Sequence, residues 1–205
     1  MIKAVLFDYG GVLTESGKVG GIQRALGKVY GIDPASIEMA DLHYRYIRGL
    51  MTEAQFFAEL NHRYAKDVPA TRELFEAENS GFFAKCQPVY DLAARLRATG
   101  LKTGILSNIY PMSAKSLRAQ GFYDRFDPVV LSCEEHVAKP ELAIFETALK
   151  RLDLPGNEVW FIDDQERFRE PAEALGLRFI VAESPQQIVD DVTALIKKEN
   201  NLTIE

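Results

Sequence analysis

Five short apolar runs alternate with longer stretches in which apolar residues recur at helical spacing. The runs are unbroken rather than alternating with polar residues, which is typical of parallel strands buried on both faces. We predict strands at 2–7, 103–106, 129–131, 159–162 and 179–181. Strands that alternate with helices indicate a parallel sheet covered on both faces. The predicted fold class is therefore α/β, a three-layer Rossmann-like parallel sheet core.

The second half of the chain supplies helices between these strands. Amphipathic patterns predict them from Val89 to near Gly100 and at 112–120, 140–152, 170–175 and 185–197. Gly121 and Gly176 follow two of them as C-cap residues, and Pro140 suits a first helical turn. The tail from about Glu199 is expected to fray.

The segment between the first two predicted strands is different, because no strand-like run occurs there. Its apolar residues recur with helical periodicity instead: Ile22, Ala25, Leu26 and Val29; Leu42, Tyr46, Ile47 and Leu50; Phe56, Phe57, Leu60 and Tyr64; then Leu74, Phe75, Phe82 and Phe83. This pattern predicts a small unit of three or four helices. We therefore expect an α/β core domain of residues 1–16 and 86–205, with a helical cap domain of residues 17–85 inserted in it.

Composition narrows the possible partners and compartment. The 205 residues carry a net charge of -6, which argues against nucleic acid or an anionic membrane as a partner. Two cysteines, Cys86 and Cys133, are too few for a disulfide framework and fit a reducing cytoplasm. No apolar run of about 18 residues predicts a membrane span, and the N-terminus does not resemble a signal peptide.

Polar residues follow three of the predicted strands directly. Asp8 follows the first, Ser107-Asn108 the second and Asp163-Asp164 the fourth. In open α/β sheets, ligands bind beyond the carboxyl ends of the strands, so these side chains are expected to meet there. Three carboxylates in one place suit a hard divalent cation such as Mg²⁺.

These residues, with Lys139, carry a resemblance to a known family. Asp8-Tyr9-Gly10-Gly11-Val12, Ser107, Lys139 before Pro140, and Asp163-Asp164 match in order the four motifs of the haloacid dehalogenase (HAD) superfamily, in the branch with a helical cap after the first motif. Each motif alone is weak, but all four in order are specific. The resemblance implies a Mg²⁺-dependent phosphatase, a phosphoric monoester hydrolase, that acts on a small phosphorylated metabolite, such as a sugar phosphate, through an aspartyl-phosphate.

The first roles concern the nucleophile and the metal. Asp8 is the candidate nucleophile, since a carboxylate can attack phosphorus. Mg²⁺ would offset the repulsion between two anions. Its expected ligands are Asp8, Asp164 and the Gly10 carbonyl; Asp163 is assigned to the metal site, through a bound water, by the resemblance.

The remaining roles concern the phosphoryl group. Lys139 would neutralise the nucleophile and a phosphoryl oxygen, and the Ser107 hydroxyl would bind another. Backbone N–H groups of Tyr9, Gly10 and Asn108 would donate hydrogen bonds to the other phosphoryl oxygens. Structural alternatives remain open: Asp8 as a turn residue, Ser107 as a helix cap, Lys139 as a solvated lysine and Asp163 as a residue that ties down a loop.

The sequence departs from the family pattern at two positions. Most phosphatases of the superfamily carry an acid–base Asp where this chain has Gly10, and loss of such a group typically costs about 10²–10⁴-fold in rate. The substitution should favour substrates with good leaving groups. Candidate replacement acids are Glu15, Glu134, Glu135 and His136. Relatives also commonly carry Asn where Phe168 stands, and Phe168 cannot supply that amide to the metal loop.

Three rival functions use the same scaffold. A metal-independent 2-haloacid dehalogenase shares the Asp nucleophile but typically lacks the tandem acidic pair. A phosphomutase needs the acid–base residue that Gly10 replaces. A non-catalytic binding protein would have little reason to keep Asp8, Lys139 and both later acids. The sequence leaves the substrate open, and leaves a monomer and a homodimer equally open.

Overall fold

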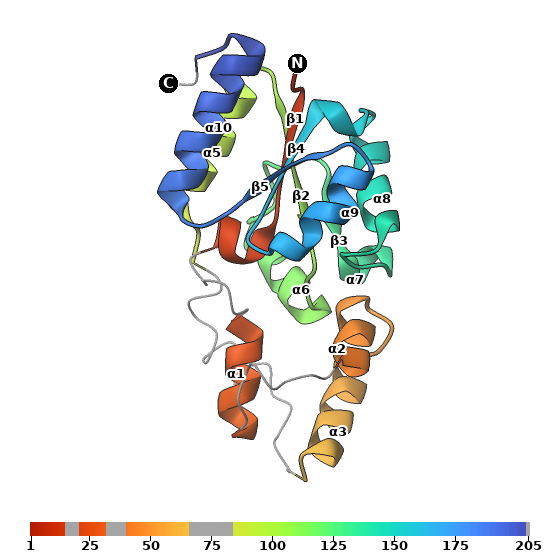
Figure 1. The fold of residues 1–205 in the computed structure, drawn as a ribbon. Coiled ribbons are helices and arrows are strands. Elements are labelled where there is room, and N and C mark those ends of the chain that lie inside the picture. The colour runs from red at the N-terminus through yellow and green to blue at the C-terminus, as the bar shows by residue number, and fades with distance from the viewer. Residues whose placement is uncertain (15–20, 32–39, 66–83, 204–205) are drawn as a thin grey trace.

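The computed structural model describes residues 1–14, 21–31, 40–65 and 84–203, and its centre is a five-stranded sheet (Figure 1). The strands are β1 Ala4–Phe7, β2 Lys102–Ser107, β3 Val129–Leu131, β4 Val159–Asp163 and β5 Arg178–Val181. Their order is β3-β2-β1-β4-β5, and each neighbouring pair is parallel. All five predicted strands are confirmed.

The register of the sheet aligns the polar residues that follow its strands. Phe7 on β1 lies beside Ile105 on β2 and Ile162 on β4. Asp8 therefore follows β1 at the level where β4 reaches Asp163, and the Asp8 N–H donates to the Ile162 carbonyl over 2.8 Å. The register brings residues far apart in the sequence to one edge.

Helices cover both faces of this sheet, which confirms the three-layer α/β class. On one face α5 (Gln87–Ala98) packs against α10 (Pro185–Asn200), and on the other lie α8 (Leu142–Leu152) and α9 (Arg169–Ala174) (Figure 1). Each face has its own buried apolar cluster. The remaining core helices are α6 (Pro111–Ala119) and the short α7 (Ser132–Glu135), with single 3₁₀ turns at Gly156–Glu158 and Glu166–Phe168.

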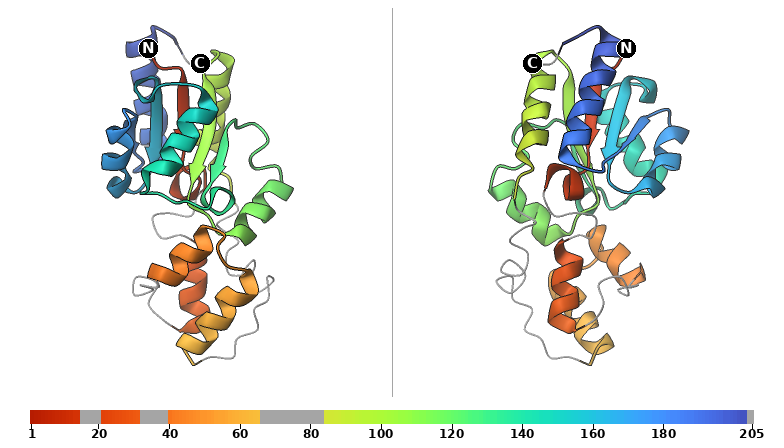
Figure 2. Two further views of the ribbon diagram at one scale, coloured as in Figure 1. Left: turned by 90° about the vertical axis from the view of Figure 1, so that its right-hand side faces the viewer. Right: turned by 60° about the vertical axis from the view of Figure 1, so that its left-hand side comes forward.

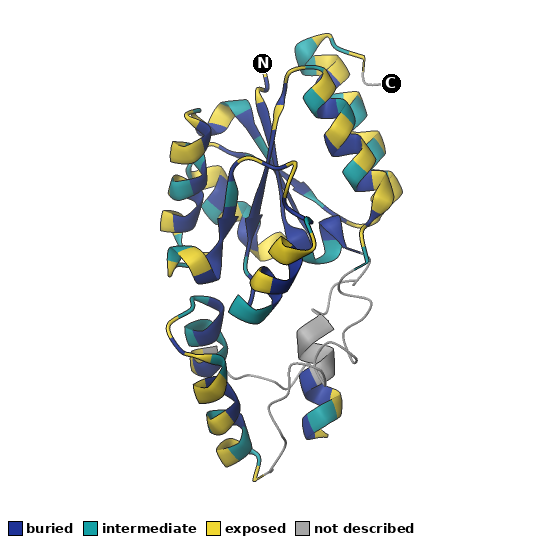
Figure 3. Cartoon of the chain, turned by 180° about the vertical axis from the view of Figure 1, so that it is seen from behind, coloured by how far each residue is buried: buried dark blue, intermediate teal, exposed yellow. Residues whose placement is uncertain are grey.

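Within the described part of the chain, three of the helices between β1 and β2 form a separate group beyond the carboxyl ends of the strands (Figures 1 and 2). They are α1 Gly21–Tyr30, α2 Ala40–Ile47 and α3 Glu53–Arg63. Thr52 and Gln55 form a reciprocal capping box that starts α3. The inward faces of α2 and α3 are buried and their outward faces exposed (Figure 3), so the predicted periodicity reflects an apolar cluster within the group.

Several details differ from the sequence prediction. Helix α8 begins at Leu142, so Pro140 precedes it rather than occupying its first turn. Helix α10 continues to Asn200, whose side chain bonds the backbone N–H and carbonyl of Ile2, so the expected fraying from Glu199 is wrong. Leu50 follows α2 and is exposed instead of packing on its apolar face. The expected helical residues Leu74, Phe75, Phe82 and Phe83 lie outside the described residues.

Within the described part of the chain, every helix is too short or too polar to cross a bilayer.

Candidate active site

Three carboxylates meet at the carboxyl edge of the sheet. Asp8 directly follows β1, Asp163 is the last residue of β4, and Asp164 follows it. One oxygen from each can be chosen so that all three lie within 4.8 Å of one another. All three side chains are almost buried, with 5%, 0% and 9% of their residue surfaces exposed. The structure thus brings together the acidic residues that the sequence predicted to meet.

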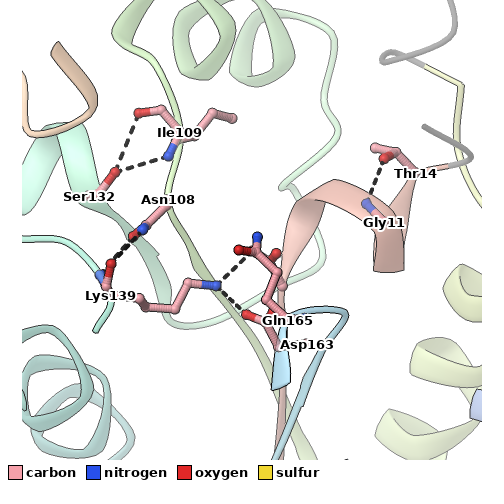
Figure 4. A network of polar contacts seen from close by, with 9 residues as sticks. Gly11, Thr14, Asn108, Ile109, Ser132, Lys139, Asp163 and Gln165 are labelled. Atoms are coloured by element: carbon pink, nitrogen blue, oxygen red, sulfur yellow. Dashed lines mark hydrogen bonds and ion pairs between the residues drawn. The ribbon is translucent and has the colours of Figure 1, made fainter. Parts of the chain in front are cut away.

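Lys139 lies against this cluster, 1% exposed (Figure 4). Its Nζ is 3.1 Å from Asp8 Oδ1 and 2.5 Å from Asp163 Oδ2. Burial lowers the pKa of Lys139, but the carboxylates of Asp163 and Asp8 outweigh burial and raise it overall. Lys139 is therefore a buried cation held by two anions, which excludes the solvated-lysine alternative.

Asp163, one of the two carboxylates in contact with Lys139, has a raised pKa and a second hydrogen-bond donor. Burial raises the pKa of Asp163 to about 7, against the opposing effect of Lys139 and with a contribution from Asp8. The other oxygen of Asp163 accepts a hydrogen bond from the Gln165 N–H over 2.8 Å (Figure 4). Both oxygens of Asp163 are thus engaged by protein donors, which suits a supporting place beside a cation better than a direct ligand place.

A tight turn over Tyr9–Leu13 (η1) carries the backbone groups of the first motif. Gly10 has φ -69° and ψ 130°, and a Cβ atom there would meet nothing within 4 Å. Gly11 has φ +72°, and a Cβ atom there would lie 2.6 Å from Asp164 Oδ2. The Gly11 N–H donates to Thr14 Oγ1 over 3.3 Å. The buried ring of Tyr9 packs against Phe122 and Tyr123. Only the backbone N–H of Tyr9 is therefore a candidate for contact with a ligand.

The end of β2 supplies the other polar side of the site. Ser107 is its last residue and is 1% exposed. The Asn108 side chain accepts from the Lys139 N–H and donates to the Lys139 carbonyl, both over 2.8 Å (Figure 4). This pair of bonds fixes the Lys139 backbone across 31 residues of sequence. Sequence reasoning assigned Asn108 only a backbone N–H role and missed the amide, because nothing local signals so distant a partner.

Two phenylalanine rings also contact the Lys139 ammonium, and no pattern in the sequence predicts these contacts. The Nζ atom lies 4.9 Å from the ring centre of Phe168 and 5.2 Å from that of Phe161. In the sequence, Phe168 is distinguished only by the amide that it lacks. In the structure its ring lies under the ammonium.

The described candidates for a replacement acid have partners elsewhere. Glu134 pairs with Arg118 at 2.8 Å, and Glu135 with Arg151 at 2.7 Å. The Nδ1 atom of His136 lies 2.8 Å from the Arg48 carbonyl. Glu15 lies outside the described residues. Arg45 and Arg48, in and just after α2, form ion pairs with Glu59 and Glu141.

The donor set of the site matches a small hard cation. Three carboxylates within 4.8 Å repel one another strongly in a nearly dry environment, and one ammonium neutralises only part of that charge. Mg²⁺ prefers carboxylate, carbonyl and water oxygens. Asp8 and Asp164, with the Gly10 carbonyl, offer such oxygens, so the residues present fit this metal.

The chain matches one protein-family model and is similar in sequence to proteins of known name. A family model of haloacid dehalogenase-like hydrolases matches residues 2–176. The acyl-CoA dehydrogenase family member 10 of Mus musculus is 32% identical over 203 residues, 95% of this chain but only 19% of the mouse protein. The sesquiterpene phosphatase AstK of Aspergillus oryzae is 24% identical over 176 residues, which are 85% of this chain and 87% of the fungal one.

A solved structure agrees in fold. It is a variant of a HAD family enzyme from Bacteroides thetaiotaomicron, in complex with magnesium and inorganic phosphate. The two chains superpose with a TM-score of 0.71 and 25% identity, over 90% of this chain and 96% of the bacterial one.

Proposed function

The chain belongs to the haloacid dehalogenase-like hydrolases, and from that membership and the site geometry we propose that it is a Mg²⁺-dependent phosphatase. The proposed reaction removes the phosphoryl group from a small phosphorylated metabolite. One observation carries the proposal: the oxygens of Asp8, Asp163 and Asp164 converge within 4.8 Å, with the buried Lys139 ammonium beside them. A phosphate complex with magnesium in a structural relative supports the same reaction class.

The metal would be held by Asp8, Asp164 and the Gly10 carbonyl, with Asp163 in support. Bound Mg²⁺ supplies positive charge that offsets the repulsion between the nucleophile and the phosphate. Lys139 adds a second positive charge from the chain itself. Because its Nζ already contacts Asp8, the ammonium lies where it can neutralise both the attacking carboxylate and a phosphoryl oxygen.

The phosphoryl group is then transferred twice, first from the substrate to Asp8 and then from Asp8 to water. An Asp8 oxygen attacks phosphorus, the bond from phosphorus to the substrate oxygen breaks, and an aspartyl-phosphate forms. The Ser107 hydroxyl and the N–H groups of Tyr9, Gly10 and Asn108 hold the phosphoryl oxygens. Water then attacks the phosphorus and releases inorganic phosphate. Since Gly10 offers no acid, the departing oxygen must leave with little protonation, which favours an anomeric phosphate or an acyl phosphate.

The helical group is proposed to select the substrate. We assign residues 17–85 to a cap domain and residues 1–16 and 86–205 to the core. Helices α1, α2 and α3 lie beyond the strand ends, on the side where the carboxylates converge (Figure 1). A cap placed there would exclude water from the reacting groups. The fungal relative is named for a phosphatase of sesquiterpenes, which extends the substrates to test from sugar phosphates to prenyl phosphates.

The test is phosphate release from p-nitrophenyl phosphate, followed by a panel of sugar, acyl and prenyl phosphates. Activity with Mg²⁺ that EDTA abolishes is the expected result. Asp8→Asn, which keeps size and removes the nucleophile, should lower kcat by more than about 10³-fold, as removal of a nucleophile does in other covalent enzymes. Acid quench during turnover should trap phosphate on Asp8.

Two outcomes contradict the proposal. Turnover of 2-chloropropionate in EDTA, without phosphate release, would assign the chain to the dehalogenases. If Asp8→Asn abolishes activity while acid quench traps no phosphoenzyme, attack by Asp8 on phosphorus is the part that fails.

A further inference from the structure

We propose that Phe161 and Phe168 are positioning residues for Lys139, whose ammonium their ring faces hold between Asp8 and Asp163. This inference rests on the proposed function, because it assigns Lys139 a part in phosphoryl transfer. It gives Phe168 a role of its own in place of the missing amide.

Lys139 is a charge in a place that does not favour charges. It is 1% exposed, and a buried ammonium is stable only when its surroundings replace the lost water. Its Nζ donates a hydrogen bond to Asp163 Oδ2 over 2.5 Å and forms an ion pair with Asp8 Oδ1 at 3.1 Å. The remaining surface of the ammonium also needs an electron-rich neighbour.

The two rings meet that need. Both ring centres lie within about 6 Å of Nζ, the range in which a ring face attracts a cation. Phe161 is 0% and Phe168 is 1% exposed, so water does not weaken the attraction. Phe161 is fixed on β4, and Phe168 closes the 3₁₀ turn that follows the acidic pair. The rings are thus attached to the same segment that carries Asp163 and Asp164.

The backbone of Lys139 is fixed separately. Asn108 bonds both its N–H and its carbonyl, so the start of the side chain is set by β2. The end of the side chain is set by the two carboxylates and the two rings. If the rings were only apolar filling, any side chain of similar shape would serve. If they hold the cation, their electron density matters.

Fluorinated phenylalanine separates these two roles, because fluorine withdraws electron density from the ring face while the shape is nearly kept. Mono-, di- and trifluorophenylalanine are placed at position 168 of the full chain. We expect kcat/KM for p-nitrophenyl phosphate to fall with each fluorine, to about tenfold below the unmodified protein for the trifluoro form. The melting temperature should fall by no more than a few degrees along the series, because the shape of the ring is nearly kept.

The matched control is the same series at Phe145. Its ring packs edge-on against Phe161, 5.8 Å between centres, in the same apolar cluster. Fluorination there should leave kcat/KM unchanged. Equal activity of all fluorinated forms at position 168, or equal losses at both positions, would overturn the proposal.

A second measurement keeps the test independent of activity. In a crystal structure of Phe168→Leu, the Lys139 Nζ should no longer contact both Asp8 and Asp163, whereas in Phe145→Leu it should. An unmoved Nζ in Phe168→Leu contradicts the positioning role. If the unmodified protein releases no phosphate with Mg²⁺, the proposed function fails, and the two crystal structures alone decide whether the rings place the lysine.

Discussion

At the scale of single residues, two adjacent glycines have opposite reasons to be glycine. Gly11 combines a left-handed φ of +72° with the close approach of Asp164 Oδ2. Gly10 has an ordinary extended backbone and open space where a side chain would stand. The backbone geometry therefore requires glycine at position 11. At position 10 the geometry would accept a side chain, so the effect of glycine there is chemical: it leaves the site without an acid.

Gly11→Ala should damage both the fold and the metal site. The left-handed backbone costs an alanine about 1–2 kcal/mol, and the new Cβ would displace the Asp164 carboxylate. We expect a loss of unfolding free energy of about that size in urea titration, and a higher Mg²⁺ concentration for half-maximal activity. Gly10→Ala is the control for stability and should unfold like the original protein. Equal stabilities of the two variants would contradict the argument.

Gly10→Asp should install the acid that the chain lacks. The backbone there accepts any residue, and a Cβ atom meets nothing within 4 Å. Because an acid helps poor leaving groups most, hydrolysis of alkyl phosphates should rise relative to that of p-nitrophenyl phosphate, by up to about 10²-fold. Gly10→Asn keeps the size without the proton and should show no such change. A uniform loss with both substrates would mean that the position cannot serve proton transfer.

At the scale of helices and strands, the sequence predicted what depends on local pattern. Unbroken apolar runs such as 159–162 identified the strands, and parallel order then required Asp8 and Asp163 to meet. Support between distant elements was not predictable. The Asn108 amide reaches Lys139 from another strand, and Phe168 reaches it from another turn. Neither contact has a periodic signal, because each depends on how the elements pack rather than on neighbouring residues.

The same limit applies to the ends of elements. Pro140 suits a first helical turn by local preference, yet α8 begins two residues later, after Glu141 has accepted the Ala138 N–H. Asn200 was expected to fray, but its side chain bonds the backbone of Ile2 at the other end of the chain. In both places a specific contact outweighs local propensity.

At the scale of the whole molecule, the contact between the helical group and the core has polar and aromatic parts. Tyr110, the N-cap residue of α6, enters the apolar cluster of the helical group and stacks on Tyr46 of α2, 5.0 Å between ring centres. Ser132 donates to the Ile47 carbonyl over 2.6 Å, and Arg48 pairs with Glu141 at 2.5 Å. The end of α2 is thus fastened to the core at several points.

This contact should make stability depend on pH through His43 of α2. Its Nδ1 atom lies 2.7 Å from the Tyr110 hydroxyl, and its ring meets those of Tyr44 and Tyr110 edge-on. Burial lowers the pKa of His43 to about 4, with a further lowering by the positive charge of Arg167. The unfolded chain takes up a proton near pH 6.5, whereas the folded chain resists protonation down to about pH 4. The contribution of His43 to stability is therefore full above pH 6.5 and declines as the pH falls toward 4.

Urea unfolding at several values between pH 7.5 and pH 4.5 measures this decline. Because the His43 side chain is partly exposed, we expect its contribution to be about 1–2 kcal/mol rather than the full shift. His43→Asn keeps a polar atom near Tyr110 but has no titrating group, so it should lose that much less stability over this range than the original protein. His62→Asn, on the exposed face of α3, should behave like the original. If His43→Asn shows the same pH dependence as His62→Asn, protonation of this helix contact does not control the stability of the molecule.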